Sequence, residues 1–332
     1  MEELQQGNEN QKPSLPVTEW SVNCALYVDP CTGQADLKFY ADSINSNLGG
    51  FFLASLVCGN EGEYSKRLTW GGNSTMWYKN IQYSGIASEP HGSHPLYQKD
   101  EIQALRDRNP SMVPIISFGG AKNVPLEVNQ TDVDLIVAEY ESVISNYGFT
   151  YLDMNFEASI ISNHDALTRH IKAMTQLRKK HPDLRISYTL SAYPCGFNDP
   201  DGKWFVNELA KNEIVPDVIQ PMLMYMGDPK KDQYDVAMDT LTAVIADVKK
   251  TSWGWTESQI KDRLGLCPMF GKSDAVWTLE DQQKLLKLAQ DWNVAVMSGW
   301  YVNMDASTGF KYSKIAAQYT RKKYPTPPPA SR

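Results

Sequence analysis

Eight short apolar segments alternate with helical segments along nearly the whole chain, and this alternation limits the possible folds most. The apolar segments are 23–28, 50–58, 112–118, 150–156, 185–191, 217–224, 264–268 and 295–301. Amphipathic helical patterns lie between them, as at 132–146, 165–180, 235–250 and 279–292. Continuous apolar strands that alternate with helices are typical of a parallel sheet covered by helices. Eight such units favour a closed (β/α)₈ barrel over an open doubly wound sheet, since no glycine-rich turn follows the first strand.

The chain has 332 residues, and barrels of this class often use a chain of this length as a single domain. We expect a disordered polar leader at 1–20, the barrel at 21–323 and a proline-rich tail at 324–332. The tail contains Pro325 and the run 327–329, and proline does not continue a helix.

A long segment, 59–99, follows the second strand and is rich in aromatic residues. In a barrel this segment leaves the C-terminal face, where active sites form. A loop of this length usually has its own substructure or a function. Its aromatics either pack a small core of their own or line a cleft, and the sequence leaves both open. They are Trp70, Trp77, Tyr78, Tyr83 and Tyr97.

The composition argues against several classes of partner. The net charge is −7, whereas binding to a phosphate backbone needs clustered Lys and Arg, so no nucleic-acid partner is expected. No apolar stretch has the length of a transmembrane helix, so no membrane partner is expected either. The N-terminus lacks the apolar core of a signal peptide, which favours a cytoplasmic protein or one exported by a non-standard route.

The cysteines and histidines do not predict a metal or cofactor site. The five cysteines show no CxxC spacing and no zinc pattern with a histidine, so free thiols are expected. A Cys24–Cys31 disulfide is the alternative that remains open. His164, His170 and His181 are expected to be ordinary surface residues of one helix.

The fourth apolar segment and its end carry the most chemical information, because three polar residues alternate there with apolar ones. Alternate residues of a strand share a face, so Asp153, Asn155 and Glu157 point together into the barrel. Leu152, Met154 and Phe156 then point outward, under the helices. Buried polar groups are unfavourable unless they are hydrogen-bonded or near the open mouth. Glu157 ends the strand at the face where catalysis takes place in barrels.

This segment resembles the fourth-strand signature of the family 18 glycoside hydrolases, the chitinase family, Asp-Gly-x-Asp-x-Asp-x-Glu. Asp153 and Glu157 match, and Asn155 replaces the last Asp. Three further motifs follow in strand order. They are Ser117-Phe118-Gly119-Gly120, resembling an SxGG element; 218–224, resembling the sixth strand; and 265–271 with 277–281, resembling the seventh strand and helix of a bacterial subgroup. Trp300 matches the tryptophan of the pocket floor, and the resemblance covers about 23–305.

The resemblance implies a substrate-assisted mechanism, in which the N-acetyl group of the sugar is the nucleophile. Glu157 would be the general acid/base, and Asp153 would position the residue above it. Trp300 would pack against the N-acetyl methyl group. The expected substrate contacts are Tyr27, Gln220, Met222, Met224 and Trp300, with Asp29 also at the rim.

Thr150 and Tyr151 stand where the signature has its first Asp and Gly, and two positions of the catalytic site itself also depart from the family pattern. Asn155 keeps a hydrogen-bond acceptor but supplies no negative charge to an oxazolinium intermediate, although a related endo-N-acetylglucosaminidase family uses an Asn-x-Glu pair. Tyr225 stands where the family has an Asp after its Met-x-Tyr or Met-x-Met element. The tyrosine that the family uses near this position is then missing or displaced to Tyr225, which serves only if the strand end redirects its side chain.

Three functions are compatible with these residues. The first is a glycoside hydrolase that acts slowly on chitooligosaccharides or N-glycan cores. The second is a chitinase-like lectin that has lost turnover. The third is a barrel used as a protein-interaction or toxin subunit, suggested by the missing signal peptide.

Overall fold

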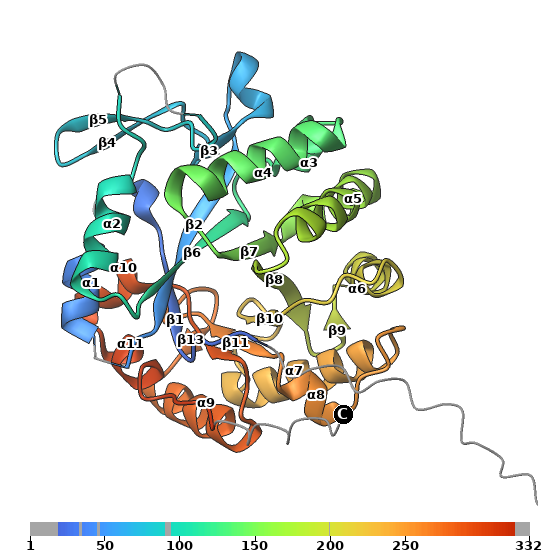
Figure 1. Cartoon of the computed structure of the whole chain (residues 1–332). Helices are drawn as coiled ribbons and strands as arrows, with labels where there is room; N and C mark the ends of the chain where they lie inside the picture. Colours follow the sequence, from blue (N-terminus) through green and yellow to red (C-terminus); the bar gives the residue numbers. More distant parts are fainter. Residues whose placement is uncertain (1–18, 33–34, 45–46, 90–93, 199, 323–332) are drawn as a thin grey trace, which may run out of the picture.

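The computed structural model describes residues 19–32, 35–44, 47–89, 94–198 and 200–322. Its centre is a ring of eight parallel strands, in the order in which they follow along the chain (Figure 1). These strands are β1 (Ala25–Val28), β2 (Gly50–Cys58), β6 (Val113–Gly119), β7 (Tyr151–Phe156), β8 (Arg185–Tyr193), β10 (Val218–Leu223), β11 (Gly265–Pro268) and β14 (Val296–Met297). A parallel bridge between Cys24 and Met297 brings the last strand back to the first. The predicted (β/α)₈ barrel is therefore confirmed, and each of the eight apolar segments coincides with all or most of one of these strands.

Helices surround the strands, as the alternation predicts (Figure 1). They are α1 (Leu37–Ile44), α2 (Lys99–Arg108), α3 (Leu126–Asn129), α4 (Val133–Tyr147), α5 (His164–Lys180), α6 (Asp201–Lys211), α7 (Gln233–Lys249), α8 (Glu257–Lys261), α9 (Leu279–Trp292), α10 (Val302–Asp305) and α11 (Lys311–Ala316). Their starts follow from capping: the Asp132 carboxylate accepts hydrogen bonds from the first turn of α4, and Asp232 does the same for α7. α9 begins with a capping box between Thr278 and Asp281.

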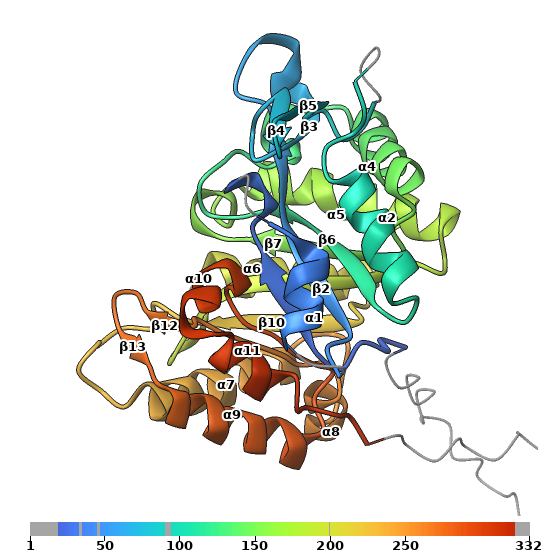
Figure 2. The same ribbon diagram turned by 90° about the vertical axis from the view of Figure 1, so that its left-hand side faces the viewer.

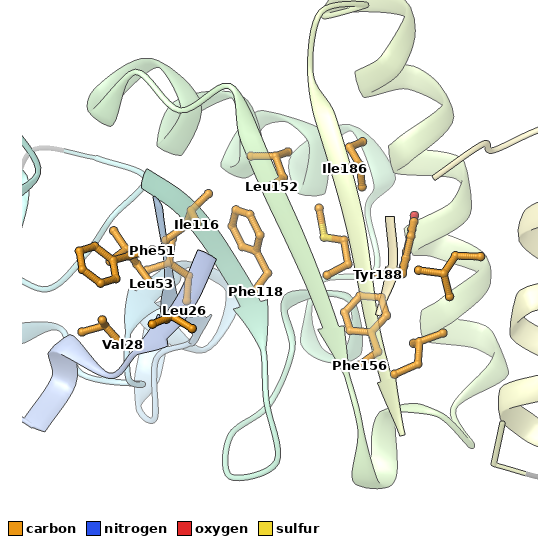
Figure 3. Close-up of a cluster of buried hydrophobic side chains, with 14 of the residues drawn as sticks. Leu26, Val28, Phe51, Leu53, Ile116, Phe118, Leu152, Phe156, Ile186 and Tyr188 are labelled. Atoms are coloured by element: carbon orange, nitrogen blue, oxygen red, sulfur yellow. The ribbon is translucent and has the colours of Figure 1, made fainter. Parts of the chain in front are cut away.

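Two apolar layers hold the barrel together. The larger one lies between the strands and the helices, and Figure 3 shows Leu152 and Phe156 of β7 pointing into it, as predicted. A smaller cluster inside the barrel contains Tyr27, Phe52 and Trp20. Trp20 is only 2% exposed, so the ordered barrel includes the last residue of the predicted leader. Residues 1–18 of the predicted leader and the whole of the predicted tail, 324–332, lie outside the described residues.

The aromatic segment after β2 has its own substructure. It contains β3 (Leu68–Trp70), which pairs antiparallel with β2, and the hairpin of β4 (Thr75–Tyr78) and β5 (Ile81–Ser84). Trp70 and Tyr97 are fully buried, whereas Trp77 is 59% exposed. The sequence left open whether these aromatics pack a core or line a cleft. Most of them pack within the segment and against the barrel. A second hairpin, β12 (Gly271–Lys272) with β13 (Val276–Trp277), lies far from the first (Figure 2).

Candidate functional site

A cleft of about 470 Å³ opens at the C-terminal ends of the barrel strands, and residues at or after all eight of these strands line it. Of the residues predicted from the sequence, the lining includes Tyr27, Asp29, Asn155, Glu157, Met222, Met224, Tyr225 and Trp300. Asp153 and Gln220 are not among them, because both side chains lie deeper, below the cleft floor. The structure thus brings most of the predicted residues together. Asp153 lies deeper, as expected of a residue that positions another, whereas Gln220 was expected to contact substrate and lies in this supporting layer instead.

Asp153 is fully buried, and four hydroxyl groups hold its carboxylate. The hydroxyls of Tyr27 and Ser117 donate to Oδ2 at 2.8 and 2.7 Å. Those of Ser187 and Thr189 donate to Oδ1 at 2.7 and 2.8 Å. Burial raises the pKa of Asp153, and these four hydrogen bonds oppose the rise because they favour the charged form. Asp153 is thus an anchored carboxylate with two donors on each oxygen.

Gln220 was predicted to bind substrate, and the structure places its side chain in the buried hydrogen-bond network around Asp153 instead. Its side chain is fully buried, and its Nε2 donates to Tyr27 Oη at 2.9 Å and to Thr189 Oγ1 at 3.0 Å. By register Gln220 pairs with Thr189, and Thr189 pairs with Asn155, so the hydrogen bonds of its side chain, and not its level along β10, direct Gln220 away from the cleft. Met222 and Met224, two and four residues further along the chain, reach the cleft.

Glu157 stands directly after β7 and lines the cleft. Burial raises the pKa of Glu157, a hydrogen bond from the Asn155 side chain lowers it, and the charge of Asp153 raises it. A raised pKa keeps a carboxyl group protonated closer to neutral pH, which suits a general acid.

Asn155 lies between Asp153 and Glu157 on the same face of β7, and it is 5% exposed. Its amide nitrogen is the end that donates to Glu157, because only an N–H group of this side chain can donate. Its Oδ1 is buried and has no hydrogen-bond partner among the described residues. A buried acceptor without a partner is unfavourable, so this oxygen is free to accept from a ligand N–H or O–H group.

Of the two glycines that follow Phe118, Gly119 is required by the close approach of β6 and β7, and both are favoured by their backbone conformation. A Cβ atom at Gly119 would lie 2.2 Å from the backbone oxygen of Asn155, and Gly120 N–H donates to this same oxygen at 2.9 Å. Both glycines have φ of +100°, a backbone region that other residues rarely adopt. The SxGG resemblance therefore has a structural basis: Ser117 holds Asp153, and the glycines let the β6 loop pass over the strand that carries Asn155.

Trp300 and Tyr225 form parts of the cleft wall. The ring of Trp300 lies 5.5 Å from that of Tyr27 and 4.7 Å from that of Tyr301, between centroids. Tyr225 follows the end of β10 and has φ of +56°, so the chain turns there and the side chain lines the cleft while remaining 54% exposed. This turn at the strand end meets the condition under which Tyr225 was predicted to serve.

Two polar residues of β8 were missed by the sequence reasoning, namely Ser187 and Thr189. Both alternate with Ile186, Tyr188 and Leu190, so the period-two pattern placed them on the inner face. That signal was available, but it lay in a strand without a carboxylate. Further cleft residues that sequence reasoning did not single out include Cys31, Ala54, Ser55, Lys122, Cys267 and Met269.

His170 corrects another prediction, because it is fully buried instead of lying on the surface. Its Nδ1 lies 2.8 Å from Glu127 Oε1, and its Nε2 lies 3.0 Å from the hydroxyl of Tyr188. Tyr140 donates a hydrogen bond to the same oxygen of Glu127. Burial would raise the pKa of Glu127, but the hydrogen bonds from His170 and Tyr140 bring it below its ordinary value. This network joins α3, α4, α5 and β8, away from the cleft.

The Cys24–Cys31 disulfide that the sequence left open is not formed, since both cysteines are free thiols. Cys24 precedes β1 and Cys31 follows it, so the extended strand separates them. No group of three or more His, Cys, Asp or Glu side chains that could hold a metal ion occurs among the described residues. In the same part of the chain, no helix is long and apolar enough to cross a membrane.

The chain matches no family model, and a search of curated proteins finds no match. It is, however, similar to solved chitinase structures. The catalytic domain of a hyperthermophilic chitinase from Pyrococcus furiosus superposes with a TM-score of 0.74 at 22% identity, over 91% of this chain and 96% of that one. Catalytic-site mutants of active domain 2 of a thermostable chitinase from that organism were solved with chito-oligosaccharides.

Two further structures extend this likeness. A GH18 chitinase from Pseudoalteromonas aurantia has a TM-score of 0.60 at 14% identity, over 89% of this chain and 99% of that one. A class V chitinase from Nicotiana tobaccum has a TM-score of 0.59 at 13% identity, over 90% and 98%. The chain therefore has the fold of the family 18 chitinase barrels, in agreement with the resemblance of its motifs.

Proposed function

We propose that this protein is a glycoside hydrolase that cleaves β-1,4-linked N-acetylglucosamine in chitooligosaccharides or N-glycan cores by substrate-assisted catalysis. The observation that carries the proposal is the pair at the end of β7. Glu157 has a pKa raised by burial, and the adjacent Asn155 Oδ1 lacks a partner among the described residues. A proton donor beside a free acceptor fits a substrate with a glycosidic oxygen next to an acetamide N–H group.

In the proposed reaction, the protonated Glu157 gives its proton to the glycosidic oxygen as the bond to the anomeric carbon breaks. The carbonyl oxygen of the N-acetyl group attacks that carbon and forms an oxazolinium ion, while Asn155 Oδ1 accepts the acetamide N–H. Water then attacks the anomeric carbon, and the Glu157 carboxylate takes up a proton from it. Trp300, with Met222 and Met224, provides the apolar wall for the N-acetyl methyl group.

Asn155 also sets the expected rate. A neutral amide holds the acetamide but does not stabilise the positive charge of the oxazolinium ion. The loss of one electrostatic interaction of this kind lowers turnover by about 10²–10³-fold. We therefore propose a slow enzyme. The same substitution supports a second candidate, a lectin that binds these sugars without cleaving them.

The test is hydrolysis of fluorogenic chitobioside and chitotrioside between pH 4 and pH 8, with Glu157→Gln and Asn155→Asp measured alongside. A slow wild type, an inactive Glu157→Gln and a faster Asn155→Asp are expected. If the wild type shows no hydrolysis but Asn155→Asp does, the lectin becomes the favoured function, and calorimetry with chitooligosaccharides would then measure binding. Silence of all three proteins together with no heat of binding at millimolar sugar would overturn both proposals.

A further inference from the structure

Gln220 lies at the base of a forked chain of hydrogen bonds that ends on Asp153. From its single nitrogen Nε2, one hydrogen bond reaches the Tyr27 hydroxyl at 2.9 Å and another reaches the Thr189 hydroxyl at 3.0 Å. Tyr27 continues to Asp153 Oδ2, and Thr189 continues to Oδ1, both at 2.8 Å. The two arms of the fork thus arrive at different oxygens of the same carboxylate.

The number of protons fixes the direction of both arms. A carboxylate only accepts hydrogen bonds, so Tyr27 and Thr189 each use their one proton on Asp153. Although their oxygens lie only 2.8 Å apart, neither hydroxyl then has a proton for the other. Both present lone pairs to Gln220, and the amide NH₂ group has the two hydrogens that match them.

The other end of the amide agrees with this direction. Gln220 Oε1 is turned toward Gly265 and has no hydrogen-bond partner among the described residues. A Cβ atom at position 265 would lie 2.7 Å from this oxygen, so the glycine provides its space. An unpartnered buried oxygen is unfavourable, and the hydrogen bonds of the NH₂ end offset this cost. The hydrogen bonds donated by the NH₂ group therefore determine how the Gln220 side chain is oriented.

We propose that Gln220 is a positioning residue whose amide sets the direction of this buried chain, so that Asp153 stays a carboxylate beneath the cleft. Its consequence for catalysis rests on the function proposed above. The charge of Asp153 raises the pKa of Glu157, so a fixed negative charge at Asp153 helps Glu157 remain an acid. Gln220 acts on Glu157 only through Asp153 and does not line the cleft.

Few titratable groups face Asp153, so its ionisation reports on this chain of hydrogen bonds. Tyr27 on β1, Glu157 after β7 and Cys267 on β11 interact with its charge. The neighbouring strands β6 and β8 contribute hydroxyl groups only, from Ser117 on one side and from Ser187 and Thr189 on the other.

The experiment is a pH titration of Asp153 by infrared spectroscopy on protein labelled with ¹³C-aspartate. The Asp153→Asn variant identifies the band. Gln220→Met keeps the length of the side chain and removes both N–H donors. A hydroxyl that accepts a hydrogen bond from the amide is a better donor to the carboxylate. Without the amide, Tyr27 and Thr189 stabilise the Asp153 carboxylate less, so the Asp153 midpoint is expected to rise by about half to one pH unit, or about three- to tenfold in proton affinity. Gln220→Glu is expected to raise it further, since the new carboxylate competes for the same two protons.

Gln282→Met is the matched control. Gln282 on α9 is also a fully buried amide, and its Oε1 accepts from the indole of Trp277, outside the cleft lining. This variant should leave the Asp153 midpoint at the wild-type value. A wild-type midpoint in Gln220→Met would overturn the proposal and leave Gln220 a space-filling role. If Gln220→Met does not fold, Gln220→Leu, which also removes both N–H donors and adds no charge, decides in the same way.

This titration does not depend on turnover. Failure of the hydrolysis assay would overturn the proposed function and leave the role of Gln220 in place. An active enzyme with an unchanged Asp153 midpoint in Gln220→Met would overturn the role of Gln220 and leave the proposed function in place.

Discussion

The polar side chains of β7 and of the residue that follows it lie in two different environments. Asp153, below the cleft, receives four hydroxyl hydrogen bonds and is fully buried. Asn155 and Glu157, two and four residues further along, face the cleft, and Asn155 Oδ1 has no partner among the described residues. The lower group is complete without a ligand, whereas the upper group has an acceptor left over.

This difference shows which part of the family pattern the fold needs. A buried carboxylate without hydrogen bonds would be strongly destabilising, so Asp153 and its hydroxyl partners are constrained by stability. Asn155 contributes none of the four donors of Asp153, so an amide at 155 leaves the lower layer unchanged. The substitution at 155 therefore alters the chemistry of the cleft without a matching penalty in folding.

The largest expected effect is that of Glu157→Gln on turnover. Removal of the general acid is expected to lower hydrolysis by about 10²–10⁴-fold, while chitooligosaccharide binding measured by calorimetry is retained. Glu63→Gln, a change at an exposed glutamate outside the cleft lining, is the control and should leave the rate unchanged. Equal rates for wild type and Glu157→Gln would remove Glu157 from the mechanism.

The next effect is on stability and separates the two layers directly. Asp153→Asn places an NH₂ group against two hydroxyls that now donate, so the free energy of unfolding in urea is expected to fall by about 2–4 kcal/mol. Asn155→Leu removes a side chain that has an unpartnered acceptor and is expected to change it by less than about 1 kcal/mol. Similar losses in both variants would contradict the division into a supporting layer and a ligand-facing layer.

Asn155→Asp tests the upper layer by restoring a charge. Turnover is expected to rise by about 10- to 100-fold, since a carboxylate stabilises the oxazolinium ion. The pH profile should change as well. Glu157 must start protonated, so activity falls as the pH rises through its pKa. A neighbouring carboxylate raises that pKa and removes the amide donor, so the alkaline limb should move to higher pH. A faster enzyme with an unmoved limb would argue against Asn155 and Glu157 acting as neighbours.

Strand periodicity predicted which polar side chains point into the barrel from β7 and its end, but not the partners that surround Asp153. The spacing of Asp153, Asn155 and Glu157 predicted one inner face, and the structure confirms that all three lie on it. Depth along the barrel axis was harder, because period two assigns a face but not a level. Gln220 and Met222 share a face of β10, and Met224 follows that strand, yet only the two methionines line the cleft, while the Gln220 side chain is held in the buried network.

His170 was misjudged because of its residue type. It is spaced from Leu167, Ile171 and Met174 on the buried face of α5, so the helical pattern already favoured burial. Its partner Glu127 lies on a different helix, and pairing between distant segments is not visible in a single sequence. The backbone conformation of Tyr225 was also not predictable from the sequence. A positive φ at a residue other than glycine depends on how the strand end meets the following loop.

The smallest effect expected is at Tyr225, which belongs to the upper layer but is 54% exposed. If its ring packs against the sugar, Tyr225→Ala should weaken chitooligosaccharide binding by about three- to tenfold, while Tyr225→Phe keeps the ring and should stay within about twofold of wild type. Both variants face the same positive φ, so backbone strain does not separate them. A large loss of turnover in Tyr225→Phe would instead mean that the hydroxyl takes part in the reaction. That result would give the upper layer a second polar group that acts on the substrate, and it would reduce the share of the proposed slow rate that is assigned to Asn155.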